Sequence, residues 1–127
     1  MAGYFFDTSA IVKRYVQEAG TRWIRDLTRR GQPDLLYLAR ITTVELTSAV
    51  ARRRRGGSLT VPRARSILTR FQRQIVGRYV MVEMTPPLLT AAAKLTDQHA
   101  LRAYDTVQLA TALDLNNRWQ AGGLGGI

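Results

Sequence analysis

The sequence predicts a three-layer α/β domain, with helices on both faces of a central parallel sheet. Short apolar runs alternate with helical patterns along the 127 residues, and 46% of the residues are hydrophobic. Strands that alternate with helices pair in parallel through right-handed crossovers. A chain of this length and hydrophobic content can close one core. We therefore expect a single domain over residues 1–127.

The first half of the chain predicts two strands and three helices. Each strand is a short apolar run, and each helical pattern ends at a glycine that tolerates a left-handed C-cap: Gly20, Gly31 and Gly56. In chain order, the predicted elements are a strand at 4–6, helices at 9–19 and 21–30, a strand at 35–38 and a helix at 43–55.

The second half predicts three helices and one strand. Thr60 and Pro62 suit the start of a helix whose apolar residues recur on one face. A β-branched strand follows at 79–84, and Thr85 with two prolines then begins a helix that ends at about His99. A last helix runs from about 104 to 119. The closing segment AGGLGGI predicts either a flexible end or the approach to another strand.

The composition excludes several kinds of site. The chain has no cysteine, which excludes disulfides and thiolate metal sites, and its only histidine is His99, which argues against a histidine-rich zinc site. No apolar stretch approaches the roughly 20 residues of a membrane-spanning helix, and the N-terminus lacks a signal-peptide pattern. We therefore expect a cytoplasmic protein without membrane contact. Its formal charge of +10 favours a phosphate-bearing or acidic partner.

Three acidic residues stand near the ends of predicted strands or the starts of helices. Asp7 directly follows the first strand, at the edge where open parallel sheets bind ligands. Glu45 lies at the start of the helix after the second strand, and Asp105 in the first turn of the last helix. Asp7 also suits a helix N-cap, and Thr42 with Glu45 has the spacing of a capping box. Structural roles for these acids therefore stay open at this point.

A metal ion would explain why the acids gather. We expect Asp105 to lean inward, because Leu109 and Ala112 continue its stripe toward the core, and such an acid needs a cation or hydrogen-bond donors. Three acids that converge on one sheet edge repel one another unless a cation bridges them, and all-oxygen ligands suit Mg²⁺ or Mn²⁺. The sequence therefore predicts that Asp7, Glu45 and Asp105 hold a divalent metal.

Three segments, YFFDTSAIVKRY, TTVELTSAVARR and LRAYDTVQLATAL, resemble in this order the motif blocks of PIN-domain ribonucleases, particularly the VapC-type toxins of bacterial toxin-antitoxin pairs. The resemblance covers essentially the whole chain. It implies an endoribonuclease that hydrolyses RNA phosphodiester bonds with Mg²⁺ or Mn²⁺ held by the three acids. It also implies that Thr8 and Ser9 assist, through hydrogen bonds to the first acid or to metal-bound water.

The resemblance extends to partners and to the end of the fold. It implies a homodimer, a VapB-type antitoxin that blocks the acidic pocket, and a target such as one tRNA or one ribosomal RNA loop. Exposed apolar residues on the first helices would suit either protein contact.

Family members usually continue through a last strand to a fourth acid, whereas this sequence ends at Ile127 and its last acid, Asp114, points away from the Asp105 stripe. We expect that strand and acid to be absent from this chain. The sequence therefore does not establish a second metal position.

A set of arginines suits the RNA backbone. No acidic residue occurs between Leu46 and Val82, and guanidinium groups bind phosphates well. The alternative is a solvated helical face without a ligand. The predicted RNA-binding residues are Arg52, Arg53, Arg54, Arg55, Arg63, Arg70 and Arg73.

Two functions are consistent with these patterns. The first is a metal-dependent endoribonuclease toxin that a cognate antitoxin inhibits. The second is a catalytically incomplete PIN-like module that binds RNA or an antitoxin, because an acidic pocket can also receive the arginine of a partner.

Overall fold

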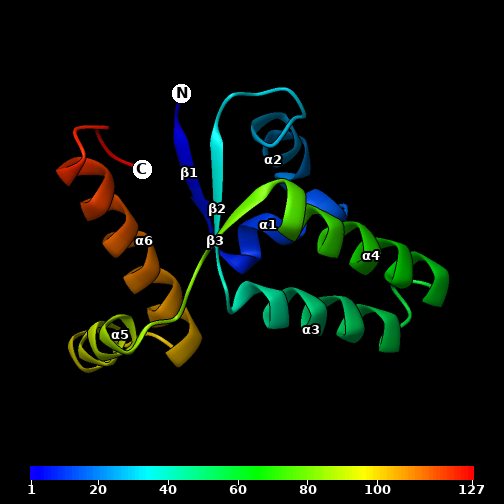
Figure 1. The fold of residues 1–127 in the computed structure, drawn as a ribbon. Coiled ribbons are helices and arrows are strands. Elements are labelled where there is room, and N and C mark those ends of the chain that lie inside the picture. Colours follow the sequence, from blue (N-terminus) through cyan, green and yellow to red (C-terminus); the bar gives the residue numbers. More distant parts are fainter.

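The computed structural model describes residues 1–127 and confirms the predicted three-layer α/β fold (Figure 1). Three strands form one parallel sheet in the order β1-β2-β3. The elements are β1 (Gly3–Phe6), α1 (Thr8–Tyr15), α2 (Thr21–Leu27), β2 (Leu35–Ala39), α3 (Thr42–Arg55), α4 (Val61–Gly77), β3 (Tyr79–Val82), α5 (Pro86–Gln98) and α6 (Ala103–Ala121).

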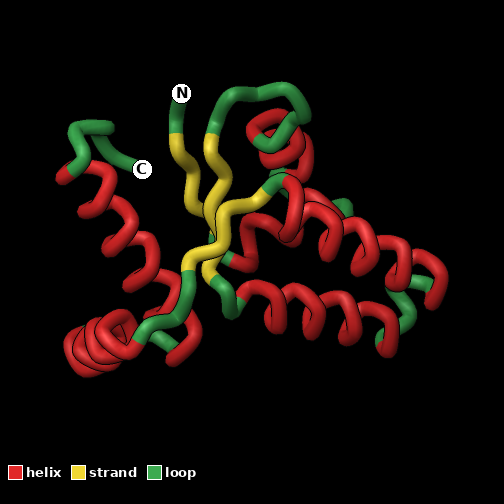
Figure 2. Tube along the Cα trace, in the orientation of Figure 1, coloured by secondary structure: helices red, strands yellow, loops and turns green.

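The sheet separates two groups of helices. Figure 2 shows α1 to α4 on one side of the strands and α5 and α6 on the other. Side chains alternate along each strand, so that Phe6, Leu36 and Leu38 join the main core with α1, α3 and α4. Phe5 and Tyr37 face the other way and pack with residues of α6. The carboxyl ends of β1 and β2 are therefore left between the two helical layers.

The order of elements agrees with the prediction, but several boundaries differ. Helix α1 ends at Tyr15, four residues before the predicted end, because Val16 has an extended backbone. Helix α2 ends at Leu27, where the Thr28 hydroxyl donates to the Ile24 carbonyl group and closes the last turn. Strand β3 ends at Val82, two residues earlier than expected.

Close packing at the N-terminal end of the sheet requires a glycine. A Cβ atom added at Gly3 would overlap the indole ring of Trp119, which α6 holds against the start of β1. The indole Nε1 of Trp119 also donates to the Tyr37 hydroxyl at 3.1 Å. These contacts fix α6 on the sheet, so that the first turn of α6 lies near the carboxyl end of β1. None of the helices combines the length and the apolarity needed to cross a membrane.

Candidate active site

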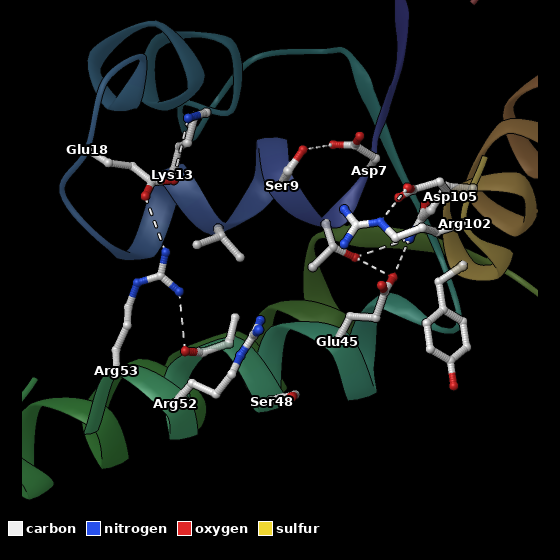
Figure 3. Close-up of a pocket in the computed structure, with 15 residues that line it drawn as sticks. Asp7, Ser9, Lys13, Glu18, Glu45, Ser48, Arg52, Arg53, Arg102 and Asp105 are labelled. Atoms are coloured by element: carbon white, nitrogen blue, oxygen red, sulfur yellow. Dashed lines mark hydrogen bonds and ion pairs between the residues drawn. The ribbon is translucent and has the colours of Figure 1, made fainter. Parts of the chain in front are cut away.

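A pocket of about 510 Å³ opens where α1, α3 and α6 meet beside the carboxyl ends of the strands (Figure 3). All three predicted acids line it, together with Thr8 and Ser9. Asp7 comes from the end of β1, Glu45 from the first turns of α3 and Asp105 from the first turn of α6. The fold therefore brings to one pocket three acids from distant parts of the sequence.

Asp7 is the N-cap of α1, so the structural role that the sequence left open is real. Its Oδ1 atom accepts hydrogen bonds from the Ala10 backbone amide and from the Ser9 hydroxyl, each at 2.9 Å. These two donors hold the carboxylate at the helix start, where the helix dipole favours negative charge. The Oδ2 atom is free of protein hydrogen bonds. Capping thus engages one oxygen and leaves the other for a ligand.

Glu45 is not part of a capping box. The N-cap of α3 is Ile41, which makes no side-chain cap, and Thr42 is buried in the first turn. Glu45 Oε1 instead accepts from the Thr8 hydroxyl at 2.8 Å and from Gln108 Nε2 at 2.9 Å. The Thr8 hydroxyl therefore contacts the second acid, Glu45, and not Asp7.

Gln108 is the centre of this hydrogen-bond network. Its Nε2 atom lies 2.9 Å from Thr42 Oγ1 and 3.1 Å from Thr8 Oγ1, in addition to its bond to Glu45. Only 7% of Gln108 is exposed, and its Oε1 atom is buried without a hydrogen-bond partner. We call Thr8, Thr42, Glu45 and Gln108 the inner wall of the pocket. Because this wall is hydrogen-bonded across three elements, it fixes the direction of the Glu45 carboxylate.

Asp105 belongs to an exposed part of the pocket, which we call the rim: Asp7, Arg102 and Asp105. The expectation that Asp105 leans toward the core is wrong, because Leu109 is exposed and the buried stripe of α6 runs through Gln108 and Thr111 instead. Arg102 Nε lies 3.3 Å from Asp105 Oδ2, and their side chains are 92% and 54% exposed. Figure 3 shows Arg102 extending beside Asp105 at the pocket.

A second set of charges lines the far end of the pocket. Glu18 pairs with Lys13 at 3.4 Å and with Arg53 at 3.3 Å. Arg53 also donates to the Ala49 carbonyl group at 3.2 Å, so its guanidinium group is held in place. Cations and acids therefore face each other across the same cavity.

The structure divides the seven predicted RNA-binding arginines. Arg52 and Arg53 line the acidic pocket. Arg70 packs over the ring of Tyr15, away from the pocket. The other four arginines are exposed and line no part of the pocket: Arg54, Arg55, Arg63 and Arg73. Only two of the seven predicted arginines therefore lie at the acidic pocket.

The oxygen atoms that line the pocket are suitable ligands for a hard divalent cation, but the three acids are not clustered around a single position. The pocket offers carboxylate and hydroxyl oxygens and no sulfur or imidazole, which is the ligand chemistry of Mg²⁺ and Mn²⁺. No group of three acidic or histidine side chains lies close enough to share a metal ion. A metal held here therefore requires the exposed rim acids to approach one another, or waters to bridge them to the ion.

Sequence reasoning missed three residues of the site. Thr42 was considered only as a helix cap, and Gln108 lies in a segment that suggested only an apolar stripe. Arg102 stands three residues before Asp105, and this spacing is the one signal that predicts their ion pair. No local pattern joins Gln108 to Thr8, because one hundred positions separate them.

Comparison with known protein families assigns the chain. No curated protein matches it, but the family model described as PIN domain matches residues 4–118, which is nearly the whole chain. The match includes Asp7, Glu45 and Asp105. PIN domains are in general nucleases, typically hydrolases that use divalent metal ions, and they act on nucleic acids. The chain, with its acidic pocket at the carboxyl ends of the strands, belongs to the PIN domain family.

Proposed function

We propose that the protein is a metal-dependent endoribonuclease that acts as the toxin of a VapC-type toxin-antitoxin pair. The observation that carries the proposal is the shared pocket of Asp7, Glu45 and Asp105, each with one carboxylate oxygen free of protein hydrogen bonds. The formal net charge of the whole chain, +10, suits a polyanionic substrate. RNA hydrolysis needs both features, because a phosphodiester must first be bound and then attacked by water.

Asp7, Glu45 and Asp105 would hold Mg²⁺ or Mn²⁺, directly or through waters. Such an ion lowers the pKa of bound water and offsets charge on the reacting phosphate. The protein's own contribution is positioning. The Ala10 amide and the Ser9 hydroxyl orient Asp7, and Thr8 and Gln108 orient Glu45. Oriented ligands need less rearrangement when the ion and the RNA bind.

Arginine side chains supply the contacts to RNA. Arg52 and Arg53 lie in the pocket, where they suit phosphates beside the scissile bond. The remaining predicted arginines, Arg54, Arg55, Arg63, Arg70 and Arg73, suit phosphates farther along the strand. The substrate proposed here is a structured RNA, such as one tRNA or one ribosomal RNA loop.

A VapB-type antitoxin and a second copy of the chain are the proposed protein partners. Trp23 on α2 is 66% exposed, which is unusual for a large aromatic side chain and favours a protein contact. An antitoxin arginine could bind the free oxygens of the pocket acids and so block the site.

The second candidate is a PIN-like module that binds RNA or an antitoxin without hydrolysis. Two observations favour it: the three acids do not form a metal-binding group, and Arg102 already pairs with Asp105. In this case the acidic pocket receives a cation of the protein or of its partner.

Cleavage of total RNA and purified tRNA by the chain separates the two candidates. The reactions contain Mg²⁺ or Mn²⁺, and EDTA is added to a parallel set. Asp7→Asn tests the first acid, and Asp97→Asn, an exposed acid on α5 outside the pocket, is the matched control. We expect discrete fragments from the wild type and from the control. Cleavage by Asp7→Asn should be slower by at least roughly 100-fold, because loss of a metal ligand should exceed the 10- to 100-fold effect of losing a residue that only orients a ligand.

Other outcomes would contradict the nuclease or locate its metal ion. Intact RNA with either metal contradicts the nuclease. Fragments that persist in EDTA, or with Asp7→Asn, contradict the role of the acids. A melting temperature that rises with Mn²⁺ in the wild type, and not in Asp7→Asn, would locate the ion independently of cleavage.

A further inference from the structure

Four arginines gather on the flank of α1 that faces away from the acidic pocket. Successive helical residues are turned by about 100°, so Arg14 points away from Ser9 and Val12, which line the pocket. None of the four lines that pocket. We call them the arginine cluster: Arg14 on α1, Arg25 on α2, and Arg63 and Arg70 on α4.

Two of these guanidinium groups lie over the ring of Tyr15. Arg70 Cζ lies 5.0 Å from the ring centroid, and Arg14 Cζ lies 5.9 Å from it. Tyr15 is buried, so its ring positions the cations and is not a platform for an RNA base. Arg25 Nε donates to the backbone carbonyl group of Arg14 at 3.3 Å, which brings α2 to the same place.

No carboxylate neutralises the arginine cluster. Every ion pair of the chain uses other cations. Arg70 Nε is buried and has no hydrogen-bond partner. Burial lowers the pKa of the Arg70 guanidinium; Tyr15 opposes this effect, while the charges of Arg14, Arg63 and Arg25 lower the pKa further. Like charges held this close are unfavourable in the free protein, and a bound anion would relieve their repulsion.

We propose that the arginine cluster is a second phosphate-binding site, which holds the RNA backbone on the far side of α1 from the acidic pocket. The proposal rests on the proposed function in taking RNA as the polyanion. Guanidinium groups are suited to phosphate oxygens, and four of them exceed what one isolated phosphate requires. With Arg52 and Arg53 on the pocket side, cations stand on both sides of α1. A chain of phosphates contacts both surfaces, whereas a free phosphate contacts one.

The test is the salt dependence of RNA binding without hydrolysis. The full chain is titrated into a labelled single-stranded RNA in EDTA, and the dissociation constant is measured by fluorescence anisotropy over a range of KCl. Each phosphate contact contributes about 0.7 to the slope of log affinity against log salt for single strands. We expect the Arg14→Gln/Arg70→Gln variant to lose about 1.4 of this slope, and to bind at least about 10-fold more weakly at low salt.

A matched substitution provides the control. Arg65 lies on α4 between Arg63 and Arg70, is exposed and belongs to neither surface. Arg65→Gln removes one positive charge, where the double variant removes two, and its slope should stay close to that of the wild type. Equal slopes for Arg65→Gln and the double variant would overturn the second site. A wild type that does not bind RNA would overturn it as well.

Two further variants distinguish a loss of RNA binding from a loss of folding. Arg25→Gln/Arg63→Gln changes only exposed side chains and should lower the slope by a similar amount. Arg70→Lys keeps the positive charge and should keep most of the salt slope of the wild type. Because binding is measured in EDTA, the result is independent of cleavage: RNA that binds through the cluster but stays intact with Mn²⁺ contradicts the nuclease alone. An unchanged slope with metal-dependent cleavage contradicts the second site alone.

Discussion

The inner wall and the rim of the acidic pocket differ in how firmly their side chains are held. Gln108 and Thr42 are buried, and the wall is joined by hydrogen bonds of 2.8–3.1 Å from three helices. At the rim, Arg102 and Asp105 are exposed and joined by one contact of 3.3 Å. Breaking a buried hydrogen bond lowers the free energy of unfolding, whereas an exposed ion pair contributes little to it. The pocket therefore combines two acids that hydrogen bonds orient, Glu45 and Asp7, with a third, Asp105, whose exposed ion pair can respond to a ligand.

The largest effect should come from breaking the inner wall. Gln108→Leu removes the amide whose Nε2 atom lies within hydrogen-bond distance of Glu45, Thr8 and Thr42, and leaves these oxygens with fewer donors. We expect the free energy of unfolding to fall by about 1–3 kcal/mol, as measured by urea denaturation. RNA cleavage should fall by about 10- to 100-fold, because Glu45 loses its orientation.

The control for Gln108→Leu is Gln120→Leu, on an exposed position of the same helix. It should change neither stability nor cleavage appreciably. If Gln108→Leu lowers stability and leaves cleavage at the wild-type rate, the wall is a structural feature only and does not position Glu45.

A smaller effect on the same wall is expected from Thr8→Val. This change removes one of two donors to Glu45 Oε1 and leaves Gln108 in place. We expect a loss of about 1 kcal/mol in the free energy of unfolding and a reduction of cleavage of about 10-fold. Thr47→Val, where the hydroxyl bonds only to a carbonyl group of its own helix, is the comparison. Equal effects of the two variants would contradict a role for Thr8 at the acid.

The rim should show a different response. Arg102→Ala removes the cation beside Asp105, and its effect on stability should stay within about 0.5 kcal/mol, because the pair is exposed. Removal of a positive charge should tighten Mn²⁺ binding by about 2- to 5-fold, measured by calorimetry or by the shift in melting temperature. Arg118→Ala breaks a similar exposed pair with Asp114 on the same helix, outside this pocket, and should not alter Mn²⁺ binding. Weaker binding to the Arg102 variant would show that this arginine supports the ion.

The smallest expected effect concerns an exposed ion pair outside the pocket. Arg40 and Glu83 join the residues that follow β2 and β3. The Arg40 hydrogen bond lowers the pKa of Glu83 below its ordinary value of 4.5, so the pair stabilises the fold above that value. This contribution is lost as the pH falls through the lowered pKa. The melting temperatures of the wild type and Glu83→Gln should differ slightly at pH 6 and converge at the lowest pH; a constant difference would contradict this origin.

Local rules predicted much of the fold and part of the site. Asp7 was recognised both as a helix cap and as an acid at a strand end, and both features depend only on its neighbours and on the sheet edge. Asp105 was placed correctly in a first turn but was expected to face inward. That error has a simple cause: the α6 pattern does not distinguish the face that packs on α5 and the sheet from the face that borders the pocket.

The sequence by itself determined the order of strands and helices, the N-caps at Asp7, Thr60 and Thr85, and the presence of acids near the starts of three helices. Propensity, capping and the parallel topology act over a few residues or follow from the alternation of elements. Only the tertiary structure decided that Gln108 holds Glu45, that Arg102 reaches Asp105 at the pocket, and that the arginines divide between two flanks of α1. These contacts depend on how helices pack across the sheet, and residues such as Thr8 and Gln108 meet only after that packing is complete.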